Sequence, residues 1–240
     1  MKKRLGVNID HVATLRNARG STHPNLLLIA KQVMKCKADS ITIHLREDRR
    51  HIKVLDVVKI CKDRNILTNL EISLNKIILK IALKNKPDFI CIVPENRKEI
   101  TTEGGLDLLK NKRNIANIIL KFKKKNIRTS LFIDPNLKNI KIANELNADC
   151  IELHTGKISD LVKNKKNFLS EYKKIKKCCV YAKKIGIEVH AGHGLDYKTT
   201  IIMSKIAEIT EFNIGHFIIG ESITYGLSKT IKKFKKILNK

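Results

Sequence analysis

Tryptophan is absent from the 240 residues of the chain, and aromatic residues make up only 5% of it. Proteins that bind single-stranded nucleic acids usually stack bases on aromatic side chains, so this scarcity argues against such a surface. The formal net charge of +26 points the other way. However, the lysines cluster at 121–126, 173–179 and 232–236, where apolar residues recur as on amphipathic helices. We therefore predict solvated helix faces and no nucleic-acid partner, with a basic RNA-binding module as a competing hypothesis.

Long apolar runs are missing as well. No apolar stretch approaches the roughly 18 residues of a membrane-spanning helix, so we expect no contact with a membrane. The two lysines at the start are not followed by an apolar segment of the secretory type. The six cysteines form no C-x-x-C pair. We expect reduced core thiols in a cytoplasmic protein.

No linker rich in Gly, Pro or Ser divides the chain, which predicts a single domain over residues 1–240. Short β-rich runs alternate with helical patterns. The predicted strands are Leu5–Ile9, Ser40–His44, Thr68–Ile72, Phe89–Val93, Thr129–Ile133, Cys150–His154, Glu188–Ala191 and Ile214–Ile219. The predicted helices are 26–36, 53–64, 75–85, 107–125, 137–146, 167–185, 198–209 and 222–238.

Several predicted strands, such as FICIV and FIIG, are almost continuously apolar, as strands of parallel sheets often are. Eight β–α units in a chain of this length predict an α/β protein with the (β/α)₈ (TIM) barrel fold. The competing fold is an open, doubly wound sheet. It usually carries a G-x-G-x-x-G turn after the first strand, and DHVATLRNARG contains none.

Active sites of such barrels lie at the carboxyl ends of the strands. The strand ends deliver Asn8, Asp10, His11, His44, Arg46, Arg49, Arg50, His51, Glu71, Asp134, Glu152, His154, Thr155, His190, His193 and His216. The prediction places all eight histidines in or just after a strand and none in the body of a helix. It therefore indicates an active site at this rim.

Two segments are suited to binding anions. In ITIHLREDRRHI, Arg46 and His51 follow a strand and can donate hydrogen bonds to a phosphate. In HAGHGL and IIGES, Gly192, Gly194 and Gly220 let backbone N–H groups approach a second anion. The alternative is that the charges pair with one another and the glycines only form turns. Two anion sites predict a substrate with two phosphates, or two phosphorylated small-molecule substrates.

His44, Glu71 and His193 are the predicted acid–base groups, because an imidazole titrates near neutral pH and burial can raise the pKa of a carboxyl group. A metal site combining histidines 190, 193, 44 and 154 with Glu152 is the alternative, and it would indicate a metal-dependent (β/α)₈ hydrolase acting on a phosphorylated small molecule. The first strand lacks an H-x-H pair and the arginines would repel a dication, so we predict no metal.

The strand ends carry no lysine, so the amine for any imine chemistry is expected to come from a substrate. The loop PENRKEITTEGG is long and ends in two glycines. It is predicted to close over the site as a lid, with a plain mobile connection as the alternative.

Long motifs of the chain resemble those of the pyridoxine 5'-phosphate synthase family. They are GVNIDHVATLRNARG, ITIHLREDRRHI, NLE, VPENRKEITTEGGLD, SLFID, IELHTG, AGHGL and NIGHFIIGESI. The resemblance implies a (β/α)₈ barrel with extra helices that assembles into dimers and then octamers. It also implies condensation of 3-amino-2-oxopropyl phosphate with 1-deoxy-D-xylulose 5-phosphate, with neither metal nor organic cofactor.

Matched motif by motif, the resemblance implies that His44 and Glu71 accept protons and that His193 donates one. It further implies two sets of binding residues. Asp10, His11, Arg46, His51 and Thr101 resemble the residues that bind the sugar phosphate, whereas Asn8, Arg19, Gly194, Gly215 and His216 resemble those that bind the amino ketone phosphate. His190, next to AGHGL, is given no catalytic role.

Overall fold

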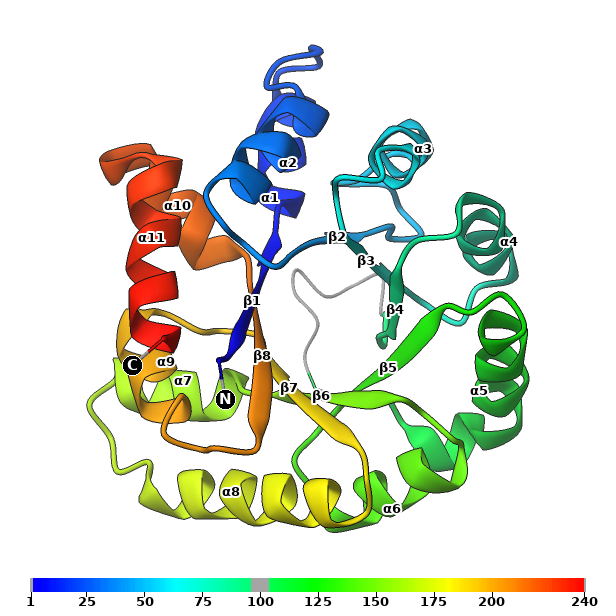
Figure 1. Cartoon of the computed structure of the whole chain (residues 1–240), viewed down its shortest axis with the longest axis vertical. Coiled ribbons are helices and arrows are strands. Elements are labelled where there is room, and N and C mark those ends of the chain that lie inside the picture. Colours follow the sequence, from blue (N-terminus) through cyan, green and yellow to red (C-terminus); the bar gives the residue numbers. More distant parts are fainter. Residues whose placement is uncertain (1, 96–103, 240) are drawn as a thin grey trace.

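The computed structural model describes residues 2–95 and 104–239. Its strands form a closed parallel barrel in which each strand pairs with the next and β8 returns to β1 (Figure 1). The strands are β1 (Arg4–Asn8), β2 (Ser40–His44), β3 (Thr68–Ile72), β4 (Phe89–Ile92), β5 (Arg128–Ile133), β6 (Cys150–His154), β7 (Glu188–Gly192) and β8 (Ile209–Ile214). The predicted (β/α)₈ fold is confirmed.

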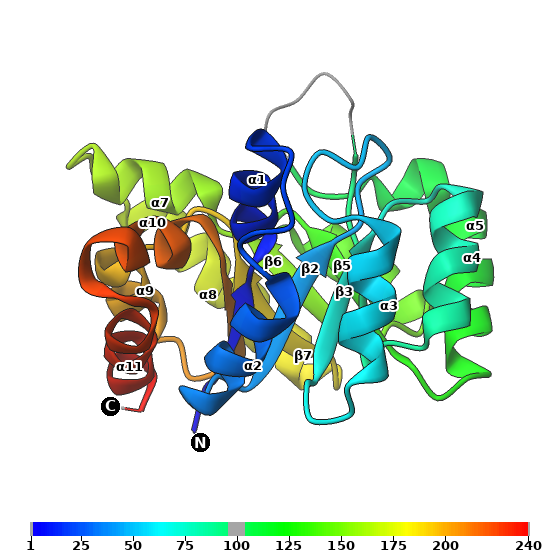
Figure 2. The same ribbon diagram turned by 90° about the horizontal axis from the view of Figure 1, so that it is seen from above.

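Among the described residues, eight helices form the outer ring of the barrel. They are α2 (Leu26–Lys35), α3 (Val54–Lys62), α4 (Lys76–Asn85), α5 (Leu108–Lys123), α6 (Leu137–Glu145), α8 (Leu169–Lys184), α9 (Tyr197–Met203) and α11 (Leu227–Leu238). Three further helices follow strands directly and lie toward the carboxyl end of the barrel: α1 (Asp10–Ala18), α7 (Gly156–Lys163) and α10 (His216–Tyr225) (Figure 2). Across the described ranges, no helix has the length and apolar character needed to cross a membrane.

The hydrophobic core is the layer between the strands and the helices. Outward-facing strand residues such as Leu5, Ile41 and Leu70 are fully buried there, together with helix residues such as Phe122 and Phe234. All six cysteines are buried and unpaired, as expected for core thiols. Burial of this apolar layer stabilises the closed barrel, because removing apolar surface from water is the main favourable contribution to folding.

The interior of the barrel is mainly polar. Ser40, Thr42, Asn69, Ser130, Glu152 and Asn213 are buried on the inward-facing side of their strands. Cys91, Val93 and Phe132 form a small apolar cluster inside the barrel. Side chains alternate between the two faces of a strand, so the inward-facing residues can serve chemistry while the outward-facing ones hold the fold.

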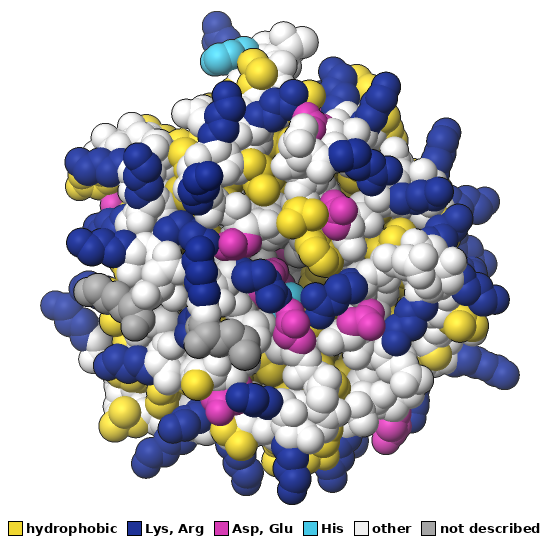
Figure 3. Space-filling view, viewed as in Figure 1, with side chains coloured by type: hydrophobic (Ala, Val, Ile, Leu, Met, Phe, Trp, Pro, Cys, Tyr) yellow, Lys and Arg dark blue, Asp and Glu magenta, His cyan; other side chains and the backbone are white. Residues whose placement is uncertain are grey.

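Charged groups close the amino-terminal end of the barrel. Arg4 Nε lies 2.7 Å from Glu211 Oε2, and Arg4 also pairs with Glu188. His190 Nε2 lies 2.8 Å from Glu188 Oε1, and its Nδ1 lies 3.5 Å from Glu211 Oε1. The prediction that His190 reaches the carboxyl rim is therefore wrong. Its position in the strand directs it into this network of charged groups. Figure 3 shows acidic and basic side chains mixed near the centre of the face that it draws.

The lysines lie mainly outside the ring of helices. Figure 3 shows Lys and Arg side chains around the whole periphery rather than along one groove. Helices α5, α8 and α11 carry many of them, opposite buried residues such as Ile119, Cys179 and Phe234. This is the amphipathic arrangement expected from the sequence.

The eighth strand lies earlier in the chain than predicted. β8 is ITEFNI, at 209–214, while the apolar run HFIIG opens helix α10. The prediction failed because it required strands to be apolar on both faces. Inside this barrel Glu211 and Asn213 face inward, so the strand alternates instead. Gly220 therefore lies within a helix and not in a phosphate-binding turn, and the predicted helix 198–209 ends at Met203.

A substitution at Gly220 tests the helical assignment of this segment. Gly220 sits inside α10, and no atom lies within 4 Å of the position that a Cβ would take. Gly220→Ala is therefore expected to raise the free energy of unfolding by about 0.5–1 kcal/mol, because glycine has excess backbone freedom in the unfolded chain. Chemical denaturation at one fixed protein concentration measures this.

Gly226 provides the matched control. It is equally free of neighbours but has a φ of 82° and a ψ of 143°, which an L-residue rarely adopts. Gly226→Ala is expected to destabilise the protein by about 1–3 kcal/mol. A destabilising Gly220→Ala would contradict the helix.

Candidate active site

Asp10 connects the carboxyl ends of the first two strands. It is the first residue of α1, immediately beyond the end of β1. Its Oδ1 accepts the backbone N–H of His44 at 2.9 Å, and its Oδ2 accepts the side-chain amide of Asn8 at 3.0 Å. Asn8 Oδ1 in turn accepts the backbone N–H of Asp10 at 2.9 Å. These bonds hold Asn8, Asp10 and His44 in one arrangement before any ligand binds.

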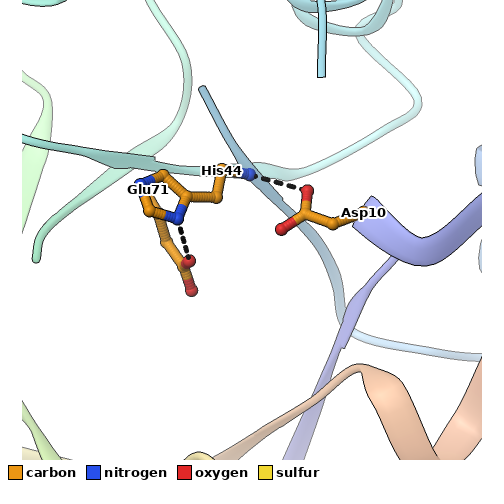
Figure 4. Close-up of side chains that lie close together, drawn as sticks. All are labelled: Asp10, His44 and Glu71. Carbon is orange, nitrogen blue, oxygen red and sulfur yellow. Dashed lines mark hydrogen bonds and ion pairs between the residues drawn. The ribbon is translucent and has the colours of Figure 1, made fainter. Parts of the chain in front are cut away.

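His44 and Glu71 lie side by side because β2 and β3 pair in register at these two residues. His44 Nδ1 is 3.7 Å from Glu71 Oε2 (Figure 4). On the other side of the ring, His44 Nε2 is 3.8 Å from Glu95 Oε2. No described residue forms a hydrogen bond with this buried Nε2. His44 therefore presents a nitrogen that a substrate atom can engage.

Burial governs the protonation of this group. It lowers the pKa of His44 to about 3, with further lowering by the charge of Arg46. Burial also raises the pKa of Glu71 well above its usual value, helped by the nearby negative charges of Glu152 and Asp10. At neutral pH the imidazole of His44 is therefore uncharged, and the raised pKa of Glu71 favours the protonated form of its carboxyl group, so the two do not form an ion pair. Such a pair can both accept and donate a proton.

Arg46 brings a buried positive charge next to this pair. Its side chain is 5% exposed, and its Nε and Nη2 form no hydrogen bond with a described residue. The nearest carboxylate oxygens belong to Asp48 and Glu95, 3.6 and 3.8 Å from Nε. A buried guanidinium with unused donors is costly, and a phosphate oxygen would satisfy it. The predicted role of Arg46 in binding an anion is consistent with this geometry.

Three histidines form a row beside Arg46. The rings of His11 and His51 stack with centroids 5.8 Å apart, and His11 meets His216 edge-on at 4.8 Å. Burial lowers the pKa of His51 to about 4, with contributions from His11 and Arg46. The prediction that every histidine lies in or just after a strand is wrong for His23. His11 and His216 begin α1 and α10, and His23 lies in the loop before α2.

His193 belongs to a second group on the rim. Its ring lies 4.8 Å from that of His154 and 6.5 Å from that of Phe132. Both histidines line a cavity of ≈ 590 Å³ together with Gly104, Gly156, Lys157, Asp160, Leu161, Asn164 and Lys166. Burial lowers the pKa of His193 to about 4. The structure thus brings His44 and Glu71 into contact and places His193 with His154.

Glu152 lies between these two groups and was not among the predicted catalytic residues. It is buried inside the barrel, and its Oε2 accepts the side-chain amide of Asn213 at 2.7 Å. Burial raises its pKa to about 7, against the opposing effects of nearby histidines. The signal was present in the sequence, because the motif CIELH places Glu152 and His154 on the same inward face of β6.

Glycines shape the rim at two of the predicted positions. A Cβ at Gly215 would lie 2.9 Å from the Cβ of Asn8, so glycine is required where α10 begins. Gly194 has a φ of 75° and packs against α7 near Ser159.

Two other predictions lie outside the described residues: the site residue Thr101 and most of the predicted lid. Arg19 lies at the end of α1 with its side chain exposed.

The metal site considered from the sequence does not assemble, since His190 lies at the other end of the barrel. One ligand atom from each of Asp10, His44 and Glu71 nevertheless lies within 4.8 Å of the other two, which is a spacing that could hold an ion. A dication requires ionised carboxylates there. Burial raises the pKa of Asp10 to about 7 and that of Glu71 as well, and the Arg46 charge lies nearby. The charge of Arg46 opposes a dication at this position, and the raised pKa values suit groups that exchange protons.

Comparisons with known proteins give a coherent result. The family model of the pyridoxal phosphate biosynthesis protein PdxJ matches residues 5–240. A pyridoxine 5'-phosphate synthase of Pelagibacter ubique (strain HTCC1062) is 74% identical over 238 residues, covering 99% of this chain and 100% of that protein. Another, from Blochmanniella pennsylvanica (strain BPEN), is 48% identical over 234 residues, covering 98% of this chain and 96% of that protein.

Among solved structures, the tryptophan synthase A-subunit of Pyrococcus furiosus superposes with a TM-score of 0.61 at 14% sequence identity. The match covers 99% of this chain and 97% of that one. At this level of identity the likeness shows the barrel fold alone.

The buried carboxyl group of Asp10 makes a prediction about stability and pH. Its pKa of about 7 in the folded protein lies above the ordinary value of 3.8, which we take for the unfolded chain. Between these two values the unfolded chain loses a proton that the folded protein keeps. Asp10 therefore favours folding less as the pH rises.

The variant Asp10→Asn removes this effect. The free energy of unfolding of the wild type minus that of Asp10→Asn is expected to fall as the pH rises from about 4 to about 7, and to stay level above that range. Denaturant titrations of both proteins across this interval measure the difference. A difference that does not change with pH would show that the carboxyl group is ionised throughout.

Proposed function

The chain belongs to the family of the pyridoxal phosphate biosynthesis protein PdxJ, and we propose that it is a pyridoxine 5'-phosphate synthase. It condenses 3-amino-2-oxopropyl phosphate with 1-deoxy-D-xylulose 5-phosphate to give pyridoxine 5'-phosphate, inorganic phosphate and water. The observation that carries this proposal is the relative of that name that is 74% identical over 99% of the chain. The protonation of His44 and Glu71 supports it independently, since every step of such a condensation moves a proton.

His44 and Glu71 are the proposed proton-exchanging pair. The uncharged His44 accepts a proton through its free Nε2, and the protonated Glu71 donates one or returns it. Burial is the main cause of the raised pKa of Glu71, and the neighbouring Glu152 adds to this shift. The net charge of the pair stays at zero when His44 takes up the proton that Glu71 releases.

The sugar phosphate is proposed to bind beside this pair, on Asp10, His11, Arg46, His51 and Thr101. The two unused donors of buried Arg46 support this placement, since they need an oxygen-rich partner. The Arg46 charge would also stabilise the phosphate that leaves during the reaction. The amino ketone phosphate is proposed to bind on Asn8, Arg19, Gly194, Gly215 and His216. The close approach of Gly215 to Asn8 supports this second set of binding residues, because it brings the start of α10 close to the end of β1.

His193 is the proposed proton donor. In the ligand-free protein its lowered pKa of about 4 leaves the ring uncharged at neutral pH. A phosphate group bound nearby would raise this pKa, because an anion favours the imidazolium. Lysines 157 and 166 line the same cavity and would help to hold such an anion. His193 then acquires the proton that it donates only when a substrate is present.

The chemistry requires no lysine from the protein. None of the eight strands contains one, so the amine of the first imine belongs to the amino ketone. The imine becomes an enamine, phosphate and water are expelled, and the ring closes and loses water to become aromatic. These steps move protons, and none of them passes electrons to an external acceptor. We therefore propose neither a metal nor an organic cofactor.

The protein is proposed to act in the cytoplasm as dimers that assemble into an octamer. Large apolar side chains left exposed on the helices support assembly, among them Leu28, Leu55 and Ile77 on the outer ring and Leu15 and Ile223 on α1 and α10. Small phosphorylated molecules, and neither nucleic acid nor membrane, are the proposed partners. A single domain over residues 1–240 is proposed to carry the whole activity.

Incubation with both proposed substrates tests this function. Purified protein treated exhaustively with a chelator is expected to form pyridoxine 5'-phosphate and one equivalent of inorganic phosphate only when both substrates are present. Product is followed by chromatography and phosphate by a coupled assay. A metal-dependent hydrolase would instead release phosphate from a single substrate and lose that activity on chelation. Steeply salt-dependent RNA binding without turnover would favour the RNA-binding module.

Glu71→Gln tests the acid–base pair. Glutamine has the same shape as the protonated glutamic acid but cannot transfer a proton. Turnover is expected to fall about 100-fold or more, while the melting temperature stays within a few degrees of the wild type. Glu145→Gln, at an exposed ion pair with Lys112, is the matched control and should leave turnover unchanged. A fully active Glu71→Gln across the pH range would remove Glu71 from this role.

A further inference from the structure

The loop between β2 and α3, residues 45–53, carries both Arg46 and His51, and the side chains of α1 hold it in place. Asn17 Nδ2 donates hydrogen bonds to the backbone oxygens of Arg50 at 3.1 Å and His51 at 2.7 Å. Asn17 Oδ1 accepts a hydrogen bond from Arg16 Nε at 3.1 Å. This bond fixes the orientation of the amide, so its N–H groups face the loop.

The far end of the loop is anchored from the same helix. Arg16 forms a buried, two-pronged ion pair with Asp56, at 2.6 and 2.8 Å. Asp56 Oδ2 also accepts the backbone N–H of Lys53 at 2.8 Å. Asn17 and Arg16 therefore hold the residues on both sides of His51 against α1. Two-pronged pairs of this kind constrain geometry as well as supplying energy.

Thr14 contacts the ring of His51 itself. Thr14 Oγ1 lies 2.7 Å from His51 Nδ1 and donates its own proton to the backbone oxygen of Asp10 at 3.1 Å. A hydroxyl group has one proton to donate. The backbone oxygen of Asp10 can only accept, so the assignment that satisfies both contacts has Thr14 Oγ1 donating to Asp10 and accepting the N–H of His51 Nδ1. The neutral ring then carries its lone pair on Nε2.

Helical spacing explains why these contacts come from one face. His11, Thr14 and Asn17 are three residues apart on α1 and lie along one stripe. His11 stacks on the His51 ring, Thr14 holds its Nδ1, and Asn17 holds its backbone. All four α1 residues that hold His51 and its loop belong to the motif HVATLRNARG, of which Thr14, Arg16 and Asn17 have no assigned role.

We propose that Thr14 and Asn17 are positioning residues for His51. Asn17 fixes the backbone of the loop, and Thr14 fixes the ring so that Nδ1 carries the proton. Nε2 is then left with its lone pair, which accepts a hydrogen bond from a hydroxyl group of the sugar phosphate rather than donating one to its phosphate group. Only the expected effect of these residues on substrate binding rests on the proposed function. The tautomer itself is a property of the ligand-free protein.

The tautomer is measured by solid-state ¹⁵N NMR of histidine-labelled protein, in which the loss of signals in His51→Gln identifies His51. Wild type and Thr14→Ser are expected to show a protonated Nδ1 and an unprotonated Nε2 at pH 7. Thr14→Val keeps the shape of threonine without the hydroxyl group and is expected to lose this preference. A wild type protonated at Nε2, or a Thr14→Val spectrum identical to wild type, would overturn the proposal, whether or not the protein makes pyridoxine 5'-phosphate.

Kinetics test the consequence for substrate binding. Thr14→Val and Asn17→Asp are each expected to raise KM for 1-deoxy-D-xylulose 5-phosphate about threefold to tenfold, the effect of one or two lost hydrogen bonds. KM for the amino ketone phosphate and kcat should change by less than threefold, and Thr14→Ser should restore normal values. Asp at position 17 still accepts from Arg16 but cannot donate to the loop.

Thr230→Val is the matched control for the loss of a helical hydroxyl group. Thr230 Oγ1 donates to the backbone oxygen of Gly226 at 3.1 Å, as Thr14 does to Asp10, but it touches no histidine among the described residues. Its kinetic constants are expected to match the wild type. An equal rise in KM for Thr14→Val and Thr230→Val, or a loss confined to kcat, would reject the positioning role. If the wild type forms no product, the proposed function fails, and the spectra still decide the tautomer.

Discussion

The alternation of side chains along eight parallel strands is the constraint on which the rest of this protein depends. Closing the sheet leaves one face of every strand in a narrow interior and the other against the helices. The outward face is apolar and supplies the core, as Leu5, Ile41 and Leu70 illustrate. The inward face is then free to be polar, provided that its groups find partners. Glu152 with Asn213, and Arg4 with Glu211, show that they do.

Burial of polar groups in that interior sets their protonation. The same loss of solvent that lowers the pKa of His44 raises those of Asp10, Glu71 and Glu152. Carboxyl groups with raised pKa values and an imidazole with a lowered pKa therefore lie together at the carboxyl end of the barrel. Such opposite shifts are typical of sites that move protons. The amino-terminal end differs, since a hydrogen bond with His190 and an ion pair with Arg4 lower the pKa of Glu188 and keep it charged.

The extra helices convert this rim into a defined site. Helices α1, α7 and α10 follow their strands almost at once, so their first residues lie at the barrel mouth. Asp10 and His11 come from α1, Gly156 from α7, and His216 from α10. Helix α1 also reaches across to the neighbouring loop through Thr14, Arg16 and Asn17. Parts of the chain that are far apart in sequence thereby share hydrogen bonds within one site.

The sequence by itself determined the fold class, seven of the eight strand positions to within one residue, and the segments that carry the site. Local periodicity and strand-end position contain that information, because each depends on residues close together in the chain. It did not reveal β8, since ITEFNI becomes a strand only where a polar barrel interior accepts Glu211 and Asn213. Nor did it reveal that His190 faces the opposite end, that Glu152 lies between Glu71 and His154, or that Thr14 bonds to His51. Those contacts join strands and helices from separate β–α units, and only closure of the barrel brings them within hydrogen-bonding distance.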